Sequence, residues 1–145
     1  MEMYLYKHIY MSSSIEHVAL LIKKAQHRHH RWMDAALAAL GLSLVQWNAL
    51  REIQRNPGAS MHQLAEVTFN SDQAFGTLTT RLLRSGLIER TPGPGRVSHH
   101  RLTPKGEKLL GEGGKLVQAV FARSFAPLSG EECDTLAALL AKLLS

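Results

Sequence analysis

The stretch SGLIERTPGPGRVSHHRLTPKGEKL, Ser85–Leu109, decides the fold of this 145-residue chain. Residues 87–90 and 97–102 carry strand-favouring side chains on either side of the turn Pro92-Gly93-Pro94-Gly95, which predicts two short strands. Because proline has no amide hydrogen to donate to a central ladder, we expect an exposed, two-stranded hairpin. Basic residues flank this turn on both sides.

The positive charge of the chain is concentrated around this hairpin. The whole chain has a formal net charge of +5, and the segment from Arg81 to Lys108 holds seven basic residues against Glu89 and Glu107. That segment therefore accounts for the entire net charge. Such a concentration is typical of a nucleic-acid-binding protein, although a merely solvated basic face has the same composition.

The overall composition predicts one globular domain with a substantial core. The hydrophobic fraction is 45%, and no stretch approaches the roughly 18 apolar residues of a membrane span. The single cysteine, Cys133, excludes an internal disulfide and fits a cytoplasmic chain.

Upstream of the hairpin, the sequence predicts one long helix and three short ones. Residues 15–40 have apolar side chains at helical spacing, with Gly41 at the expected end. The capping boxes Ser43-x-x-Gln46 and Ser60-x-x-Gln63 open two short helices. Asn70 or Ser71 caps the third, whose buried face is predicted to hold Phe75, Leu78 and Leu82.

Two further helices are predicted after the hairpin. Thr103 and Pro104 form a typical helix start, and we expect the glycines at 111, 113 and 114 to weaken or break that helix midway. Ser129-x-x-Glu132 opens the last helix. Three short helices followed by a basic hairpin are the plan of a winged helix-turn-helix, in which the third short helix enters the DNA major groove.

The order and spacing of four segments resemble the MarR (multiple-antibiotic-resistance regulator) family: LVQWNALREI, MHQLAEV, RLLRSGLIER and LTPKGEKLL. The resemblance implies a mainly α fold with a small β-hairpin wing and a homodimeric transcription regulator. It implies one domain over residues 1–145, in which residues 13–41 and 104–145 form dimerisation helices and residues 43–103 form the DNA-binding lobe.

The sequence departs from the family pattern in two places. The turn before the third short helix is Thr68-Phe69-Asn70 in place of a Leu-Gly-Val-like run, and we expect Asn70 to take the left-handed conformation of the glycine. In the wing, Arg96 matches the family's arginine by position but lacks the acidic neighbour before it.

The outer face of the third short helix supplies the candidate DNA base contacts, which are Asp72, Gln73, Gly76, Thr77 and Thr80. The Gln73 amide suits bidentate pairing with adenine, and Thr77 suits a base edge or a thymine methyl group. Asp72 has a second interpretation, as a partner of the helix dipole.

The candidates for phosphate contacts, which position the protein without reading sequence, are Ser71, Arg81, Arg84, Arg96 and Arg101. His99 and His100 alternate on a strand, and we favour a structural role for them.

The resemblance also implies an effector site between the dimerisation region and the DNA-binding lobe. We assign His29, Met33 and Trp47 to it, with plain core packing as the alternative. His27, His29 and His30 suggest a metal site, but His30 and Asp34 at helical spacing give two ligands where structural zinc needs about four. We therefore assign no metal and no cofactor.

The sequence thus predicts a dimeric, sequence-specific DNA-binding regulator, interpreted as a repressor that an unknown small-molecule effector releases from a near-palindromic operator. The alternatives are a winged-helix protein-interaction module without DNA specificity and a metal-responsive regulator. The chain has no HExxH, no GxSxG and no complete phosphate loop, so we expect no enzyme activity.

Overall fold

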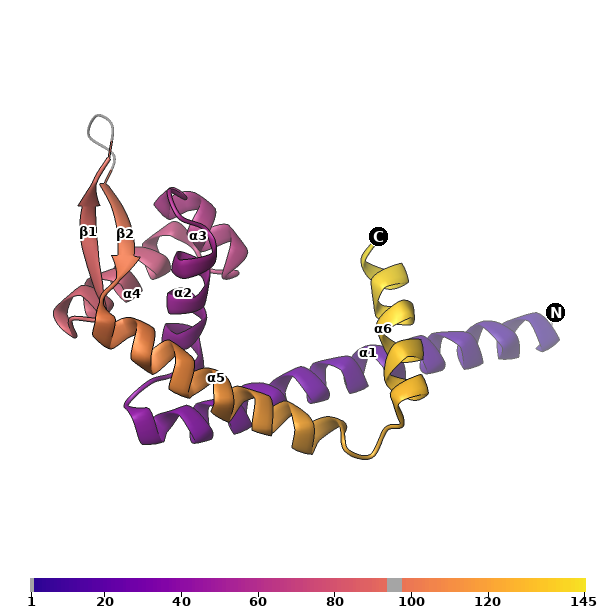
Figure 1. Ribbon diagram of the computed structural model, residues 1–145. Helices are drawn as coiled ribbons and strands as arrows, with labels where there is room; N and C mark the ends of the chain where they lie inside the picture. The colour runs from indigo at the N-terminus through magenta and orange to yellow at the C-terminus, as the bar shows by residue number, and fades with distance from the viewer. Residues whose placement is uncertain (1, 94–97) are drawn as a thin grey trace.

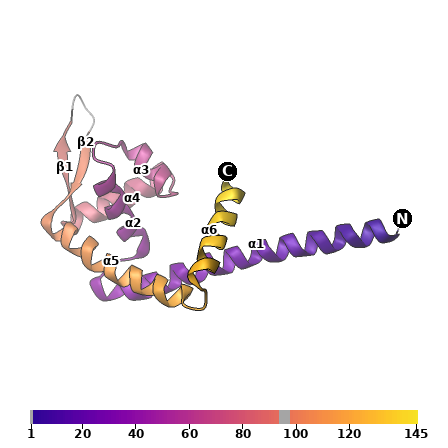
Figure 2. The same ribbon diagram turned by 45° about the vertical axis from the view of Figure 1, so that its right-hand side comes forward.

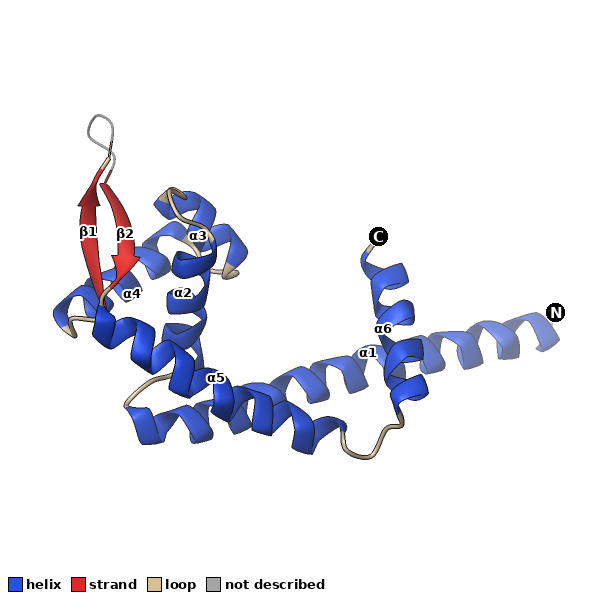
Figure 3. Ribbon diagram, in the orientation of Figure 1, coloured by secondary structure: helices blue, strands red, loops and turns tan. Residues whose placement is uncertain are grey.

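The computed structural model describes residues 2–93 and 98–145 and shows a mainly helical chain with one two-stranded antiparallel sheet. The elements in chain order are α1 (Glu2–Leu37), the 3-10 turn η1 (Ala38–Leu40), α2 (Leu44–Arg55), α3 (Met61–Val67), α4 (Asp72–Arg84), β1 (Ile88–Pro92), β2 (Ser98–Leu102), α5 (Pro104–Phe125) and α6 (Gly130–Leu144). Helices α2, α3 and α4 and the hairpin form one lobe, and α1 and α5 run side by side away from it (Figures 1 and 2). The expected fold class is confirmed, as the colouring by secondary structure shows (Figure 3).

Local capping signals set the start of each helix after α1. Ser43, Ser60 and Ser129 each accept a hydrogen bond from the backbone amide three residues later, and a Gln or Glu side chain completes each capping box. Thr103 caps α5, with Pro104 as its first residue. Of the two candidates for the cap of α4, Ser71 is the residue that accepts from the Ala74 amide.

Helix α1 is longer than the sequence pattern predicted. We expected it to begin near Ile15, but it begins at Glu2. No glycine or proline interrupts residues 2–37, so nothing in that segment ends a helix once it has formed. At its other end, the 3-10 turn η1 leads into Gly41, which has the left-handed conformation expected there.

Of the two expected effects of the glycines, a break in the helix after the hairpin is wrong, because α5 runs continuously from Pro104 to Phe125. Gly113 is buried where α5 crosses the indole of Trp47. A Cβ atom at Gly113 would lie 2.6 Å from Cδ1 of Trp47 and 3.0 Å from a methyl group of Leu37. This glycine therefore allows three helices to approach closely.

The hairpin has the predicted antiparallel pairing with slightly different bounds. Ile88 pairs with Leu102 at its base and Pro92 pairs with Ser98 at its far end. Leu87 precedes the strand and is buried. Pro94, Gly95, Arg96 and Val97 lie outside the described residues.

The turn between α3 and α4 corrects a second expectation. The left-handed residue is Phe69, with φ of 57°, and not Asn70. Asn70 instead holds the turn, because its side-chain amide donates to the carbonyl and the hydroxyl of Thr68.

One hydrophobic core joins the lobe to α1 and α5. Its most deeply buried large side chains are Leu37, Leu50, Phe75 and Leu82. Helix α6 contributes no buried residue to this core, and its side chains Leu136, Leu139 and Leu143 are exposed. None of the described helices is apolar over enough of its length to cross a membrane.

Candidate nucleic-acid interface and apolar groove

Helix α4 is amphipathic, with one face in the core and the other in solvent. Phe75, Leu78 and Leu82 are buried as predicted, with exposed fractions of 1%, 8% and 0%. Their helical spacing turns the intervening positions outward.

The base-contact candidates lie on the solvent side of α4. Asp72, Gln73, Thr77 and Thr80 are exposed, and Gly76 is half-buried with no atom within 4 Å of where its Cβ would be. The hydroxyls of Thr77 and Thr80 donate to helix carbonyls four residues earlier, at 3.1 Å and 3.0 Å. Each hydroxyl therefore keeps its acceptor capacity for a donor from outside.

Asp72 has a partner that the sequence did not reveal. Nδ1 of His62 lies 2.9 Å from its Oδ1, and Nε2 of the same ring lies 3.3 Å from Oε1 of Glu66. The hydrogen bond and the charge of Asp72, followed by the charge of Glu66, raise the pKa of His62 above its ordinary value. His62 thereby ties α3 to the first turn of α4 when it is protonated. The spacing of His62 and Glu66 is visible in the sequence, but the contact with Asp72 depends on the packing of two helices.

The candidates for phosphate contacts occupy different environments. Arg81 and Arg84 are exposed at the end of α4, and Ser71 is exposed at its start. Arg101 is exposed on β2, but its Nε lies 2.6 Å from Oε1 of Glu89, the residue opposite it in the hairpin. A phosphate would share Arg101 with Glu89. Arg96 lies outside the described residues.

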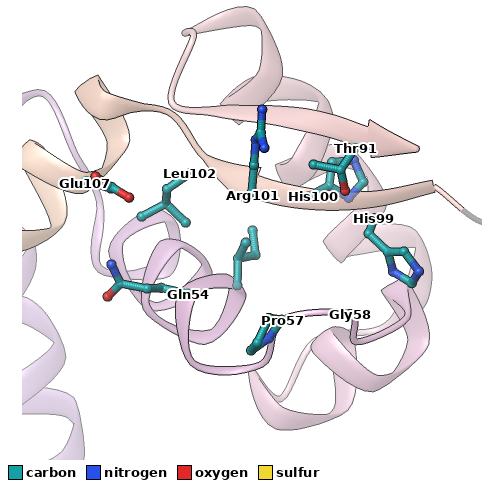
Figure 4. A pocket seen from close by; sticks show the side chains of 10 residues that line it. Gln54, Pro57, Gly58, Thr91, His99, His100, Arg101, Leu102 and Glu107 are labelled. Atoms are coloured by element: carbon teal, nitrogen blue, oxygen red, sulfur yellow. The ribbon is translucent and has the colours of Figure 1, made fainter. Parts of the chain in front are cut away.

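His99 and His100 line a cavity of about 330 Å³ between β2 and the end of α2. Figure 4 shows Gln54 and Pro57 on the α2 side of this cavity. Nδ1 of His99 and Nε2 of His100 are buried without a hydrogen-bond partner. Burial, followed by the charges of Arg90 and His99, lowers the pKa of His100.

A larger apolar groove of about 730 Å³ lies among α1, α5 and α6. Two of the three effector-site candidates, His29 and Met33, line it. Nε2 of His29 lies 2.5 Å from Oγ of Ser124, and its ring packs edge-on against Phe121 and tilted against Phe125. The third candidate, Trp47, is not in the lining.

Trp47 and the His30–Asp34 pair have structural partners. Trp47 is buried, and its indole nitrogen donates to the carbonyl of Leu110 at 3.1 Å. His30 lies 3.2 Å from Asp34, whose other oxygen accepts from the Leu44 amide. Among the described residues, no three His, Cys, Asp or Glu side chains gather as a metal site would need.

Comparison with known proteins places this geometry in a family. The sequence profile described as the MarR family matches residues 40–96. The HTH-type transcriptional repressor Rv2887 of Mycobacterium tuberculosis is 31% identical over 113 residues, which are 77% of this chain and 81% of the relative. The chain belongs to the MarR family.

Solved structures of MarR proteins have the same fold. A mutant MarR from E. coli in complex with operator DNA superimposes with a TM-score of 0.82 and 25% identity, over 91% of this chain and 96% of that one. Rv2887 in complex with p-aminosalicylic acid gives a TM-score of 0.73 and 28% identity, over 88% of this chain and 98% of that one.

Proposed function

We propose that this MarR-family chain is a homodimeric, sequence-specific DNA-binding repressor, released from its operator by a small molecule. The observation that carries the proposal is the solvent face of α4, which combines polar, base-reading side chains with exposed arginines at its end. The E. coli relative was solved with operator DNA, and the M. tuberculosis relative is named a transcriptional repressor. These relatives favour a DNA-binding regulator over an enzyme. We propose the cytoplasm as its location, because a DNA operator is reached there.

Exposed apolar side chains support the homodimer. On α1, Ile15 and Val18 are 66% and 51% exposed, and on α6, Leu139 and Leu143 are 60% and 67% exposed. A soluble monomer rarely exposes a contiguous apolar surface of this kind. A second copy of the chain would bury these side chains. We expect sedimentation of the purified protein to give twice the mass of one chain, and L139E to shift it toward the monomer.

A dimer would present two copies of α4 to one duplex. Two recognition helices about 34 Å apart require half-sites one helical turn apart, so the operator is near-palindromic. We would measure fluorescence anisotropy with the DNA upstream of the gene and with a scrambled duplex, at several salt concentrations. Tighter binding to the upstream DNA is expected, with a log–log salt slope of roughly −5 to −7 from three to four phosphate contacts per protomer. Equal and weak binding to both duplexes would favour the protein-interaction alternative.

The apolar groove is the proposed effector site. The lining is largely apolar, and its polar groups come from Gln26, Arg28, His29, His30 and Ser124. Among these, the His29 ring packs against both Phe121 and Phe125. A largely apolar lining with a few polar groups is the usual character of a small-molecule site. The M. tuberculosis relative was solved with p-aminosalicylic acid, so that compound is the natural first probe. We expect it to weaken operator binding by the wild type and to have less effect on H29A. An effector releases DNA only by binding better to the arrangement that does not fit the operator.

A further inference from the structure

The turn between α3 and α4 presents an aromatic side chain to solvent. Phe69 is 98% exposed, and it is the one non-glycine residue with a positive φ among residues 2–93 and 98–145. Val67, two residues earlier, is 48% exposed. The turn thus forms a small apolar projection directly before the recognition helix.

Hydrogen bonds hold this turn in place. The amide of Phe69 donates to the carbonyl of Glu66, and that of Asn70 donates to the carbonyl of Ala65. The hydroxyl of Thr68 donates to the carbonyl of Leu64 at 2.7 Å and accepts from the Asn70 side chain. The backbone that positions the ring is therefore fixed.

Neither local conformation nor packing within the chain explains a phenylalanine at this position. The left-handed conformation is unfavourable for a residue with a Cβ and is readily adopted by glycine. The exposed ring of Phe69 gains no burial against its own chain that would offset this cost. A strained backbone at an exposed position is typical of a site that contacts another molecule.

The position of the turn favours DNA as that molecule. Phe69 is two residues before Ser71, the cap of α4, and three before Asp72, the first base-contact candidate. Helix α6 and the N-terminal half of α1, whose exposed apolar side chains we expect a second copy to cover, lie away from the lobe that holds this turn (Figures 1 and 2). A duplex that receives the first turn of α4 passes next to this turn, and its major groove offers apolar thymine methyl groups.

We propose that Phe69 is a further DNA-contact residue, whose ring packs against an apolar group of the duplex, a thymine methyl or a deoxyribose, beside the base pairs that α4 reads. This inference rests on the proposed DNA-binding function. The contact adds affinity at the operator that a glycine in the same turn cannot supply.

The test compares F69G, F69L and the wild type on a duplex that the wild type has selected from a random-sequence library. Val45, which is 39% exposed on α2, provides the control variant V45A. Because glycine suits the left-handed turn, F69G is expected to raise the melting temperature while it weakens binding about tenfold, as for the loss of a half-buried phenylalanine. F69L and V45A should bind within about twofold of the wild type, since F69L keeps an apolar side chain there.

The outcomes separate this inference from the function on which it rests. If the wild type selects no preferred sequence, the proposed function fails. If the wild type binds its selected duplex and F69G binds it equally well, Phe69 makes no DNA contact and the inference alone is overturned. Replacing thymine by deoxyuracil in the selected duplex identifies the group: loss of the Phe69 effect points to the methyl group, and its persistence points to the sugar.

Discussion

Replacing Gly113 by alanine tests the close packing of α5 against α1 and α2. The added methyl group would lie 2.6 Å and 2.8 Å from Cδ1 and Nε1 of Trp47. Both distances are shorter than a carbon contact allows, so the indole or the whole helix must move. The hydrogen bond from Trp47 to Leu110 depends on the same indole position.

Two destabilising contributions and one stabilising contribution set the expected change in the free energy of unfolding. Overpacking costs about 1–3 kcal/mol, and loss of the indole hydrogen bond costs about 1 kcal/mol more. Alanine gives back about 1 kcal/mol through its higher helix propensity. We therefore expect G113A to lower the free energy of unfolding by about 1–3 kcal/mol.

Gly111 provides a matched control in the same helix. It is exposed, and no atom lies within 4 Å of where its Cβ would be. G111A is therefore expected to raise the free energy of unfolding by up to about 1 kcal/mol. Urea denaturation at one fixed protomer concentration measures both variants, because the stability of the proposed dimer would depend on concentration. A G113A protein as stable as the wild type would refute the packing argument.

Three further predictions concern charged groups of the lobe. An NMR titration should give His62 a pKa above 6.5, and the D72N substitution should lower it. The stability that this contact contributes is fully present below pH 6.5 and is lost as the pH rises through the raised pKa. An unshifted pKa in the wild type would contradict the contact. The pKa of His100 is shifted in the opposite direction, so its contribution to stability is lost as the pH falls below about 6.5. The melting temperature of H100Q should therefore be less sensitive to acid than that of the wild type. Equal sensitivity of the two proteins would argue against the burial of His100. Replacing both Arg81 and Arg84 by alanine should reduce the salt slope of DNA binding by about 3 to 4 for a dimer, and an unchanged slope would remove them from the phosphate contacts.

The elements that the sequence predicted well depend on interactions close in the chain. The capping boxes of Ser43, Ser60 and Ser129 involve residues three positions apart, so each is visible as a short motif. The two faces of α4 follow in the same way from helical periodicity, which correctly separated Phe75 from Gln73.

The features that it missed depend on contacts between distant segments. Gly113 is compatible with a continuous helix because Trp47, far away in sequence, fills the space beside it. Likewise, the His62–Asp72 contact arises only when α3 packs against α4. Residue preference alone favoured Asn70 over Phe69 for the left-handed position. In the structure Phe69 takes that position, and Asn70 follows it with its side-chain amide hydrogen-bonded to the Thr68 carbonyl.

The proposed function requires the solvent face of α4 to read DNA sequence, and a double variant on that face examines this requirement. We would measure the affinity of the wild type and of Q73A/T77A for the duplex selected by the wild type and for a scrambled duplex of equal length. We expect the double variant to lose most of its preference for the selected duplex, while its melting temperature and its weak, salt-dependent binding to the scrambled duplex stay unchanged. A double variant that folds normally and keeps the full preference would show that this face of α4 does not read the sequence.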